Sequence, residues 1–267
     1  MNSRDNGVSS AKTIAAAATC AALYAIVNIL TSPIHTPWGV GEFRPGVVIP
    51  AFYALIFGPL PAALGAGVGS VIGDLISLVP GGASTPIVAI VAGGIGNFLG
   101  FIVLGYVYQK MKAWRGFMLG TISGLFVGNL WAAAGVVFLL GLPNVLILGL
   151  LLFWFATMFP FVIIVDPILL RALRPYARSI SSAASYPELA APQKKILWTW
   201  TIIVSVLVLA TLGAFLLFQS GFTIWTGNVK SWVEILLVIS AVSVLLVGAF
   251  IPTPKEERQV PVVSSGN

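Results

Sequence analysis

The sequence predicts an all-α, polytopic membrane protein. Of its 267 residues, 58% are hydrophobic and only 8% are charged, and the mean hydropathy is +1.01. This composition leaves too little polar surface to cover a water-soluble globule. The apolar residues also occur in runs close to the roughly 20 residues that a helix needs to cross a bilayer. Finally, the basic residues are distributed between these runs in a way that orients the whole chain.

The apolar runs are interpreted as eight membrane helices. The first is longer than the apolar core of a typical signal peptide, so we expect it to be a retained span. The second is short and contains Pro50, which must lie in its first turn or kink it, so it is either a tilted short span or half of a re-entrant pair with the third. The runs are Ala11–Thr31, Pro45–Phe57, Leu60–Leu78, Pro86–Tyr108, Phe117–Leu140, Val145–Leu170, Ile196–Phe218 and Trp232–Ile251.

The Lys and Arg residues predict that both ends of the chain are cytoplasmic. With the N-terminus inside, 12 of the 14 basic residues fall on cytoplasmic segments, and only Arg44 and Lys230 fall outside. This asymmetry is typical of multi-pass proteins of the plasma membrane. The basic inner stretch at 172–195 helps to set this topology, and it could also contact anionic lipid or a cytoplasmic partner.

Three of the runs carry small residues at every fourth position, a pattern that lets membrane helices pack closely. We expect these three helices to form one tight core. The stripes are Gly65/Gly69/Gly73, Ala92/Gly96/Gly100 and Gly120/Gly124/Gly128/Ala132. The first run has alanine faces that suit either internal packing or docking of another membrane subunit. They comprise Ala17, Ala18, Ala21, Ala22 and Ala25.

Two aspartates lie inside predicted spans, where ionisable groups are costly and often functional. Asp74 falls in the outer half of the third run, where it either faces a ligand or is held by Ser70 or Ser77. Asp166 is interpreted as a structural or partner-facing pair with Arg171. Amides in apolar helices bond between helices by default. The other polar or aromatic candidates within spans are Asn28, Asn97, Asn129, Trp131 and Trp154.

The first outer loop, 32–44, combines an aromatic residue, both signs of charge, and prolines and glycines that shape it. Such a loop could close over a bound solute, with Trp38 stacking on it and Glu42 and Arg44 making polar contacts. The alternative is an interfacial belt in which Trp38 and Phe43 lie among lipid headgroups and Glu42 pairs with Arg44.

Several function classes lack the residues that they require. There is no G-x-x-x-x-G-K-[ST] motif for binding a nucleotide and no H-E-x-x-H metal motif. One cysteine, Cys20, and one histidine, His35, cannot build the usual catalytic or metal sites. We therefore expect no enzyme activity, no metal and no cofactor. The basic residues lie between apolar runs rather than along a folded surface, so we expect no nucleic-acid partner.

Glu42-Phe-Arg-Pro-Gly-Val-Val-Ile-Pro50, Phe57-Gly-Pro59, Gly65 to Gly73-Asp74 and Gly96-Asn-Phe-Leu-Gly100 follow an alanine-rich first helix. From about Ala11 to Arg174 the chain thus resembles the S components of energy-coupling factor (ECF) vitamin transporters. The resemblance implies a six-helix binder of a small vitamin-like solute that works with a transmembrane coupling subunit and cytoplasmic ATPases.

The resemblance also implies where the chain binds its partners. The first helix would present Ala17-x-x-x-Ala21 or Ala18-x-x-x-Ala22 to the coupling subunit. The solute would lie under the first loop, with helices four to six contributing. With the polar candidates above, the expected substrate-binding residues are Trp38, Glu42, Arg44, Asp74, Asn97, Asn129, Trp131 and Trp154.

The predicted organisation is an S-component-like six-helix bundle plus two additional C-terminal transmembrane helices, which depart from the family pattern. The expected segments are a substrate-binding core at 1–174, a basic cytoplasmic linker at 175–195, a two-helix extension at 196–251 and a disordered tail at 252–267. A stand-alone secondary transporter or channel, or a non-catalytic membrane assembly subunit, remains an alternative function. The residues suit a planar heterocycle bearing an acid or a base, so riboflavin, thiamine and biotin fit equally well.

Overall fold

The computed structural model describes residues 3–36, 38–77 and 85–173. Within these ranges the chain is helical, and the only β-type pairing is an isolated bridge between His35 and Glu42. The elements are α1 (Ser3–Thr31), the 3₁₀ turn η1 (Pro45–Val47), α2 (Val48–Phe57), α3 (Pro59–Ile76), α4 (Pro86–Val88), the π-helical turn η2 (Ala89–Gly94), α5 (Ile95–Met111), α6 (Ala113–Leu140) and α7 (Val145–Ala172). The predicted all-α fold is confirmed.

Five helices of the described region are long and apolar enough to cross a membrane, and the helix at Pro45–Phe57 is shorter. α4, η2 and α5 together form one of the five. The protein is therefore a multi-pass membrane protein. The predicted C-terminal helices, Ile196–Phe218 and Trp232–Ile251, lie outside the described residues, as do the linker and the tail.

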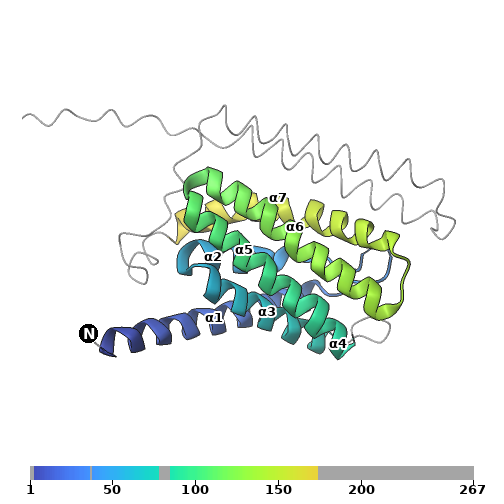
Figure 1. Ribbon diagram of the computed structural model, residues 1–267, viewed down its shortest axis with the longest axis horizontal. Coiled ribbons are helices and arrows are strands. Elements are labelled where there is room, and N and C mark those ends of the chain that lie inside the picture. The colour runs from blue at the N-terminus through green and yellow to red at the C-terminus, as the bar shows by residue number, and fades with distance from the viewer. Residues whose placement is uncertain (1–2, 37, 78–84, 174–267) are drawn as a thin grey trace, which may run out of the picture.

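The helices of the bundle lie side by side (Figure 1). α1 packs on α3, α3 on α5, α5 on α6, and α6 on α7, while α2 contacts α3, α5 and α7. The loop between α1 and η1 lies at one end of this bundle, and the turn between α5 and α6 lies at the other. This arrangement encloses space between the first loop and four helices.

The glycine stripes bring helix backbones together, but not in the single cluster predicted above. A Cβ atom on Gly69 of α3 would lie 2.6 Å from the carbonyl oxygen of Ala21 in α1. A Cβ atom on Gly124 of α6 would lie 2.6 Å from the carbonyl oxygen of Gly100 in α5. Such distances exclude any side chain, so close packing depends on glycine here. The α3 stripe faces α1, whereas Gly96 and Gly100 of α5 face the stripe of α6.

The short α2 is explained by the course of the chain before it. Arg44, just before η1, already lies at the level of Asp74 within α3, so the chain enters the bundle as a loop and becomes helical only partway through. Pro50 sits in the first turn of α2, the first of the two alternatives given above, where its missing N–H leaves no hydrogen bond unmade. Gly58 then reverses the chain with φ +92°, a conformation that favours glycine.

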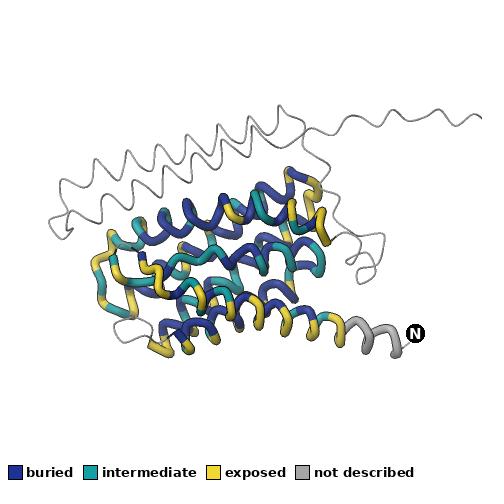
Figure 2. Tube along the Cα trace, turned by 180° about the vertical axis from the view of Figure 1, so that it is seen from behind, coloured by how far each residue is buried: buried dark blue, intermediate teal, exposed yellow. Residues whose placement is uncertain are grey.

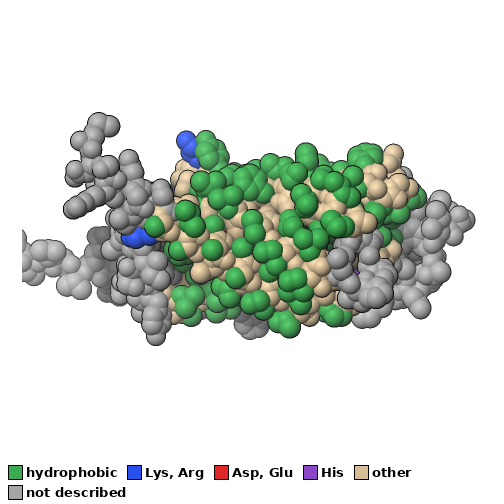
Figure 3. Space-filling model, turned by 90° about the horizontal axis from the view of Figure 1, so that it is seen from below, with side chains coloured by type: hydrophobic (Ala, Val, Ile, Leu, Met, Phe, Trp, Pro, Cys, Tyr) green, Lys and Arg blue, Asp and Glu red, His purple; other side chains and the backbone are tan. Residues whose placement is uncertain are grey.

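The surface matches a membrane environment. Figure 2 shows exposed residues recurring along the outer side of α1, with buried residues concentrated where the helices meet. On the face drawn in Figure 3, hydrophobic side chains cover the length of the bundle, and the visible Lys and Arg atoms gather at the end where α1 begins. Apolar sides with charge confined to an end are what a bilayer requires.

The predicted pairing of Asp166 with Arg171 is wrong. Asp166 is fully buried, and neither of its carboxylate oxygens has a hydrogen-bond partner among the described residues, whereas Arg171 is exposed. The two positions are five residues apart on α7, which places them on different sides of a helix with 3.6 residues per turn.

Candidate functional site

The first loop folds back on itself as a small hairpin. The amide of Phe43 donates to the carbonyl of Ile34 at 2.8 Å, and the amide of Thr36 donates to the carbonyl of Gly41 at 2.9 Å. The Thr36 hydroxyl donates to the Val40 carbonyl at 2.6 Å. Gly41 adopts a left-handed φ of +81°, which lets the strand-like halves turn toward the bundle. The loop therefore has a defined shape.

Two tryptophans hold this hairpin against α7. The indole Nε1 of Trp154 donates to the backbone carbonyl of Glu42 at 2.9 Å, and its ring lies so close to Gly41 that a Cβ there would be 2.5 Å away. From the loop side, the ring of Trp38 meets Phe153 edge-on with centroids 6.1 Å apart. It also covers Gly149, where a Cβ would be 2.9 Å from the ring. The loop is thus attached to α7 at two levels.

The other end of the loop is attached to α3 through Arg44. Its guanidinium donates to Asp74 Oδ1 at 2.5 Å and to Ser70 Oγ at 2.9 Å. The carboxylate of Glu42 lies 3.9 Å from the same guanidinium. Ser70 and Asp74 are one helical turn apart, so both face the loop. The first loop therefore bridges α7 and α3 across the end of the bundle.

Burial and neighbouring charge act in opposite directions on the pKa values of Glu42 and Arg44. Burial raises the pKa of Glu42 above its usual value, and the positive charge of Arg44 only partly opposes this. Burial acts to lower the pKa of Arg44, but the negative charge of Asp74 more than compensates, so the pKa rises and the guanidinium stays charged.

A hydrogen-bond chain extends this anchor through three helices. Asn97 of α5 donates from Nδ2 to Ser70 Oγ at 3.1 Å and to the Gly93 carbonyl at 2.8 Å. The hydroxyl of Tyr24 in α1 donates to Asn97 Oδ1 at 2.9 Å. Both ends of the Asn97 amide are thereby bonded. Since Ser70 also contacts Arg44, the chain runs from α1 to the loop.

The π-helical turn before α5 makes room for this cluster. π-Turns within α-helices often occur at functional sites, because the extra residue shifts the side chains that follow. Gly93 lies in this turn, and a Cβ there would be 2.5 Å from Asp74 Oδ2 and 3.1 Å from Ser70 Oγ. A glycine at this position is what allows the Asp74 carboxylate to reach Arg44.

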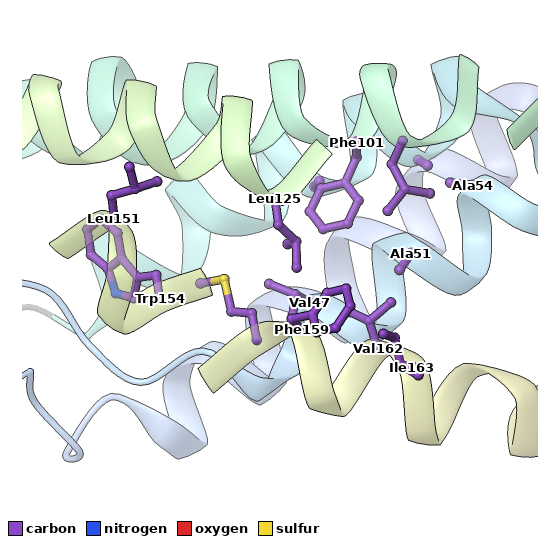
Figure 4. Close-up of a cluster of buried hydrophobic side chains, with 14 of the residues drawn as sticks. Val47, Ala51, Ala54, Phe101, Leu125, Leu151, Trp154, Phe159, Val162 and Ile163 are labelled. Atoms are coloured by element: carbon purple, nitrogen blue, oxygen red, sulfur yellow. The ribbon is translucent and has the colours of Figure 1, made fainter. Parts of the chain in front are cut away.

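A cavity lies beneath the loop, bounded by the loop end and by α3, α5, α6 and α7. Its empty space is about 730 Å³ when the open mouth is included. Figure 4 shows Phe101 and Leu125 pointing toward Val47, with Trp154 farther along the same cluster next to Leu151. The lining residues are Gly41, Arg44, Val47, Asp74, Val88, Ala92, Gly93, Gly96, Asn97, Gly100, Phe101, Gly124, Leu125, Gly128, Asn129, Ala132, Val136, Trp154 and Met158.

Residues 8–175 match the family model described as "ECF-type riboflavin transporter, S component". The chain belongs to this family. The match covers the described bundle from residue 8 onward and more than half of the sequence, and it confirms the resemblance stated above. No curated protein and no solved structure gave a significant match. The S component is the membrane-embedded, substrate-binding subunit of an ECF-type transporter.

Five of the eight substrate-binding residues expected in this S component line the cavity: Arg44, Asp74, Asn97, Asn129 and Trp154. The other three do not belong to its lining. Trp38 and Glu42 hold the loop in place, and Trp131 is 44% exposed with its Nε1 donating to the Val91 carbonyl at 2.8 Å. The roles of all eight in binding stay predictions.

The sequence analysis did not single out Tyr24 or Gly93. Tyr24 lies in an ordinary apolar stretch of α1. No sequence pattern indicated that its hydroxyl would bond inside the bundle rather than lie at the membrane interface. Gly93 adjoins Gly94, and the Gly-Gly pair in an apolar run was an available signal of a helix irregularity. Ser70 was considered only as a neighbour of Asp74.

The alanine pairs of α1 separate in the S component. Ala21 is 5% exposed and packs against Gly69 of α3, and the carbonyl of Ala17 faces Gly65. Ala18 and Ala22 are exposed. Ala17 and Ala21 thus make contacts inside the bundle, whereas Ala18 and Ala22 lie on a surface that a second membrane protein could reach.

Proposed function

We propose that this S component binds a vitamin-like solute in the cavity beneath the first loop, with riboflavin as the first candidate. The observation that carries the proposal is the position of the cavity beneath a loop attached to both α3 and α7. An apolar chamber with a few fixed polar groups suits a heterocycle. The description of the matching family names riboflavin.

The proposed transport cycle depends on other subunits. A transmembrane coupling subunit would dock on the exposed alanine face of α1, and cytoplasmic ATPases would supply the energy. The loop would face the outside of the cell and both chain ends the cytoplasm, as the distribution of Lys and Arg predicts. Solute would therefore enter from the outer surface.

Titration of the purified, detergent-solubilised protein with riboflavin tests the binding. Saturable quenching of tryptophan fluorescence, with a matching rise in the thermal unfolding midpoint, is expected, because a ligand that binds only the folded state stabilises it. Thiamine, biotin and other vitamins form the comparison panel. If no compound in the panel binds, the protein is not the proposed solute binder.

A cavity-filling variant and a lipid-facing control locate the site. Ala132→Trp places a large ring in the cavity and should abolish the riboflavin-induced shift. Leu130→Trp adds a ring on the same helix at a position that is 40% exposed, and it should leave the shift intact. Equal effects of the two variants on the riboflavin-induced shift would show that the solute does not bind in this cavity.

A further inference from the structure

The π-helical turn η2 releases a backbone carbonyl from its helical hydrogen bond. In an α-helix the amide of Ile95 would donate to the carbonyl four residues earlier, which is that of Val91. Here this amide donates to the carbonyls of Ile90 and Ala92 instead. The Val91 carbonyl therefore lacks its α-helical donor. Inside a bilayer such a group is costly, because no water is present to replace the missing bond.

Trp131 of α6 supplies the missing donor. Its indole Nε1 donates to the Val91 carbonyl at 2.8 Å. The side chain of Trp131 is 44% exposed and does not belong to the cavity lining. The tryptophan therefore bonds to the turn from outside the solute cavity.

Close packing between α6 and the turn fixes the position of the indole. A Cβ on Gly135 of α6 would lie 2.8 Å from the Cβ of Ala92 in the turn. A Cβ on Gly96, just after the turn, would lie 3.2 Å from the Cβ of Ala132. The two segments are in contact on the stretch of α6 that carries Trp131, so α6 has little freedom to rotate the indole away from the carbonyl.

The same turn belongs to the polar cluster and to the cavity wall. Gly93 leaves the space that Asp74 occupies, since a Cβ there would lie 2.5 Å from Asp74 Oδ2. The Gly93 carbonyl accepts a hydrogen bond from Asn97 Nδ2 at 2.8 Å, and Ala92, Gly93 and Asn97 all line the cavity. Relaxation of the turn to a regular α-helix would shift the residues on one side of it by one position, a rotation of about 100°.

We infer that Trp131 is a positioning residue of the solute site, because its hydrogen bond to the Val91 carbonyl holds the π-helical turn that shapes the cavity wall. Trp131 acts through this turn and touches no solute. This role replaces the expectation that Trp131 binds the solute directly. Its effect on solute affinity rests on the proposed function, whereas its effect on the turn is measurable without a solute.

Two substitutions separate the hydrogen bond from the aromatic ring. Trp131→Phe keeps a ring and removes the donor, so riboflavin should bind about threefold to tenfold more weakly, the range for loss of an interhelical hydrogen bond. In Trp131→His the imidazole Nε2 is as many bonds from Cβ as the indole Nε1, so this variant restores the donor. Its affinity for riboflavin should stay within about twofold of the wild type. Isothermal titration calorimetry measures both.

Phe126→Leu is the matched control for the ring. Phe126 is another exposed aromatic residue of α6, at 49%, and it has no hydrogen bond to lose, so riboflavin affinity should not change. If Trp131→Phe binds riboflavin as tightly as the wild type, or if Trp131→His is as weak as Trp131→Phe, the hydrogen bond does not position the site.

A second experiment requires no solute. Trp131 and Asn97 bond to different carbonyls of one turn, so Trp131→Phe and Asn97→Leu should each lower the unfolding temperature of the solute-free protein. The double variant should lose less than the sum of the two losses, because the turn relaxes only once. Phe126→Leu combined with Asn97→Leu should be additive.

Full additivity of Trp131→Phe with Asn97→Leu would overturn the inference, since the two side chains would then act independently of a shared turn. If the wild type binds no compound of the vitamin panel, the proposed function fails. The unfolding temperatures would still decide whether Trp131 holds the turn.

Discussion

The guanidinium of Arg44 and the carboxylate of Asp74 are joined at 2.5 Å, although the two residues are 30 positions apart and one belongs to a loop. This pair draws the end of the loop into the bundle, which explains why α2 begins partway through it. The pair also forms one side of the cavity. A single contact therefore sets the length of a helix and the position of the loop.

Removing either member of this pair should destabilise the protein, because it leaves a buried charge without its partner. We expect Asp74→Asn to lower the free energy of unfolding by about 3–5 kcal/mol, the usual range for a broken buried pair. Thermal unfolding of the detergent-solubilised protein measures the loss. The double variant Arg44→Gln/Asp74→Asn should recover part of it, and a simple sum of the two single losses would show that the residues are not coupled.

Removal of the Glu42 carboxylate, in contrast, should not destabilise the protein at neutral pH. Burial raises its pKa in the folded protein, so the folded state favours the protonated acid. The resulting stabilisation is complete below the ordinary carboxyl pKa and is lost as the pH rises through the folded-state value. Glu42→Gln should therefore leave stability at neutral pH equal to or above that of the wild type and flatten its dependence on pH. Unfolding midpoints from acid to neutral pH test this; a strong loss at neutral pH would contradict it.

Much of the fold could be predicted from local sequence. Apolar run length identified the membrane helices of the described region. The partners of the glycine stripes could not be predicted, because spacing shows that a helix face is flat but not which helix covers it. Asp166 illustrates the same limit: its nearest basic residue in sequence lies on another side of α7.

The site was partly predictable for a related reason. Charged and amide residues in apolar surroundings are conspicuous, so Arg44, Asp74 and Asn129 were identified as candidates. The pairing of Arg44 with Asp74 could not be predicted, because Glu42 lies only two positions from Arg44 and the contact with Asp74 depends on how the loop folds. Gly93 becomes significant only when Asp74 is seen to lie against it.

Gly93→Ala should disturb the site by displacing a side chain of the site itself. The added Cβ would lie 2.5 Å from Asp74 Oδ2, so the carboxylate must move and its bond to Arg44 must lengthen. We expect weaker riboflavin binding together with a loss of stability of about 1–3 kcal/mol, the range for overpacked cores. Gly67→Ala, whose Cβ would meet the Gly94 carbonyl at 3.1 Å, controls for crowding of α3 away from Asp74. It should affect binding less.

The proposed orientation can be checked by cysteine labelling on a Cys20→Ala background. Asn144, just before α7, and Ala113, the first residue of α6, are both exposed and lie at opposite ends of the bundle. With an impermeant thiol reagent and intact cells, Asn144→Cys should react and Ala113→Cys should react only after lysis. Labelling of Ala113→Cys from outside would reverse the orientation.

The alanine face of α1 gives the last prediction, because the structure separates the two pairs that the sequence left equivalent. Ala18 and Ala22 are exposed, so Ala18→Leu/Ala22→Leu should leave unfolding temperature and riboflavin affinity unchanged. Riboflavin uptake into cells should nevertheless fall if this face docks the coupling subunit, since two bulky side chains would prevent close approach of a second helix.

Ala21→Leu is the matched variant on the inner face. Its side chain would be forced against the α3 backbone at Gly69, so it should lower the unfolding temperature before any partner is involved. Uptake that persists in Ala18→Leu/Ala22→Leu would show that the partner docks elsewhere. Loss of riboflavin binding in that double variant would instead assign the outer alanines to the stability of the bundle, because a docking surface has no role in the isolated subunit.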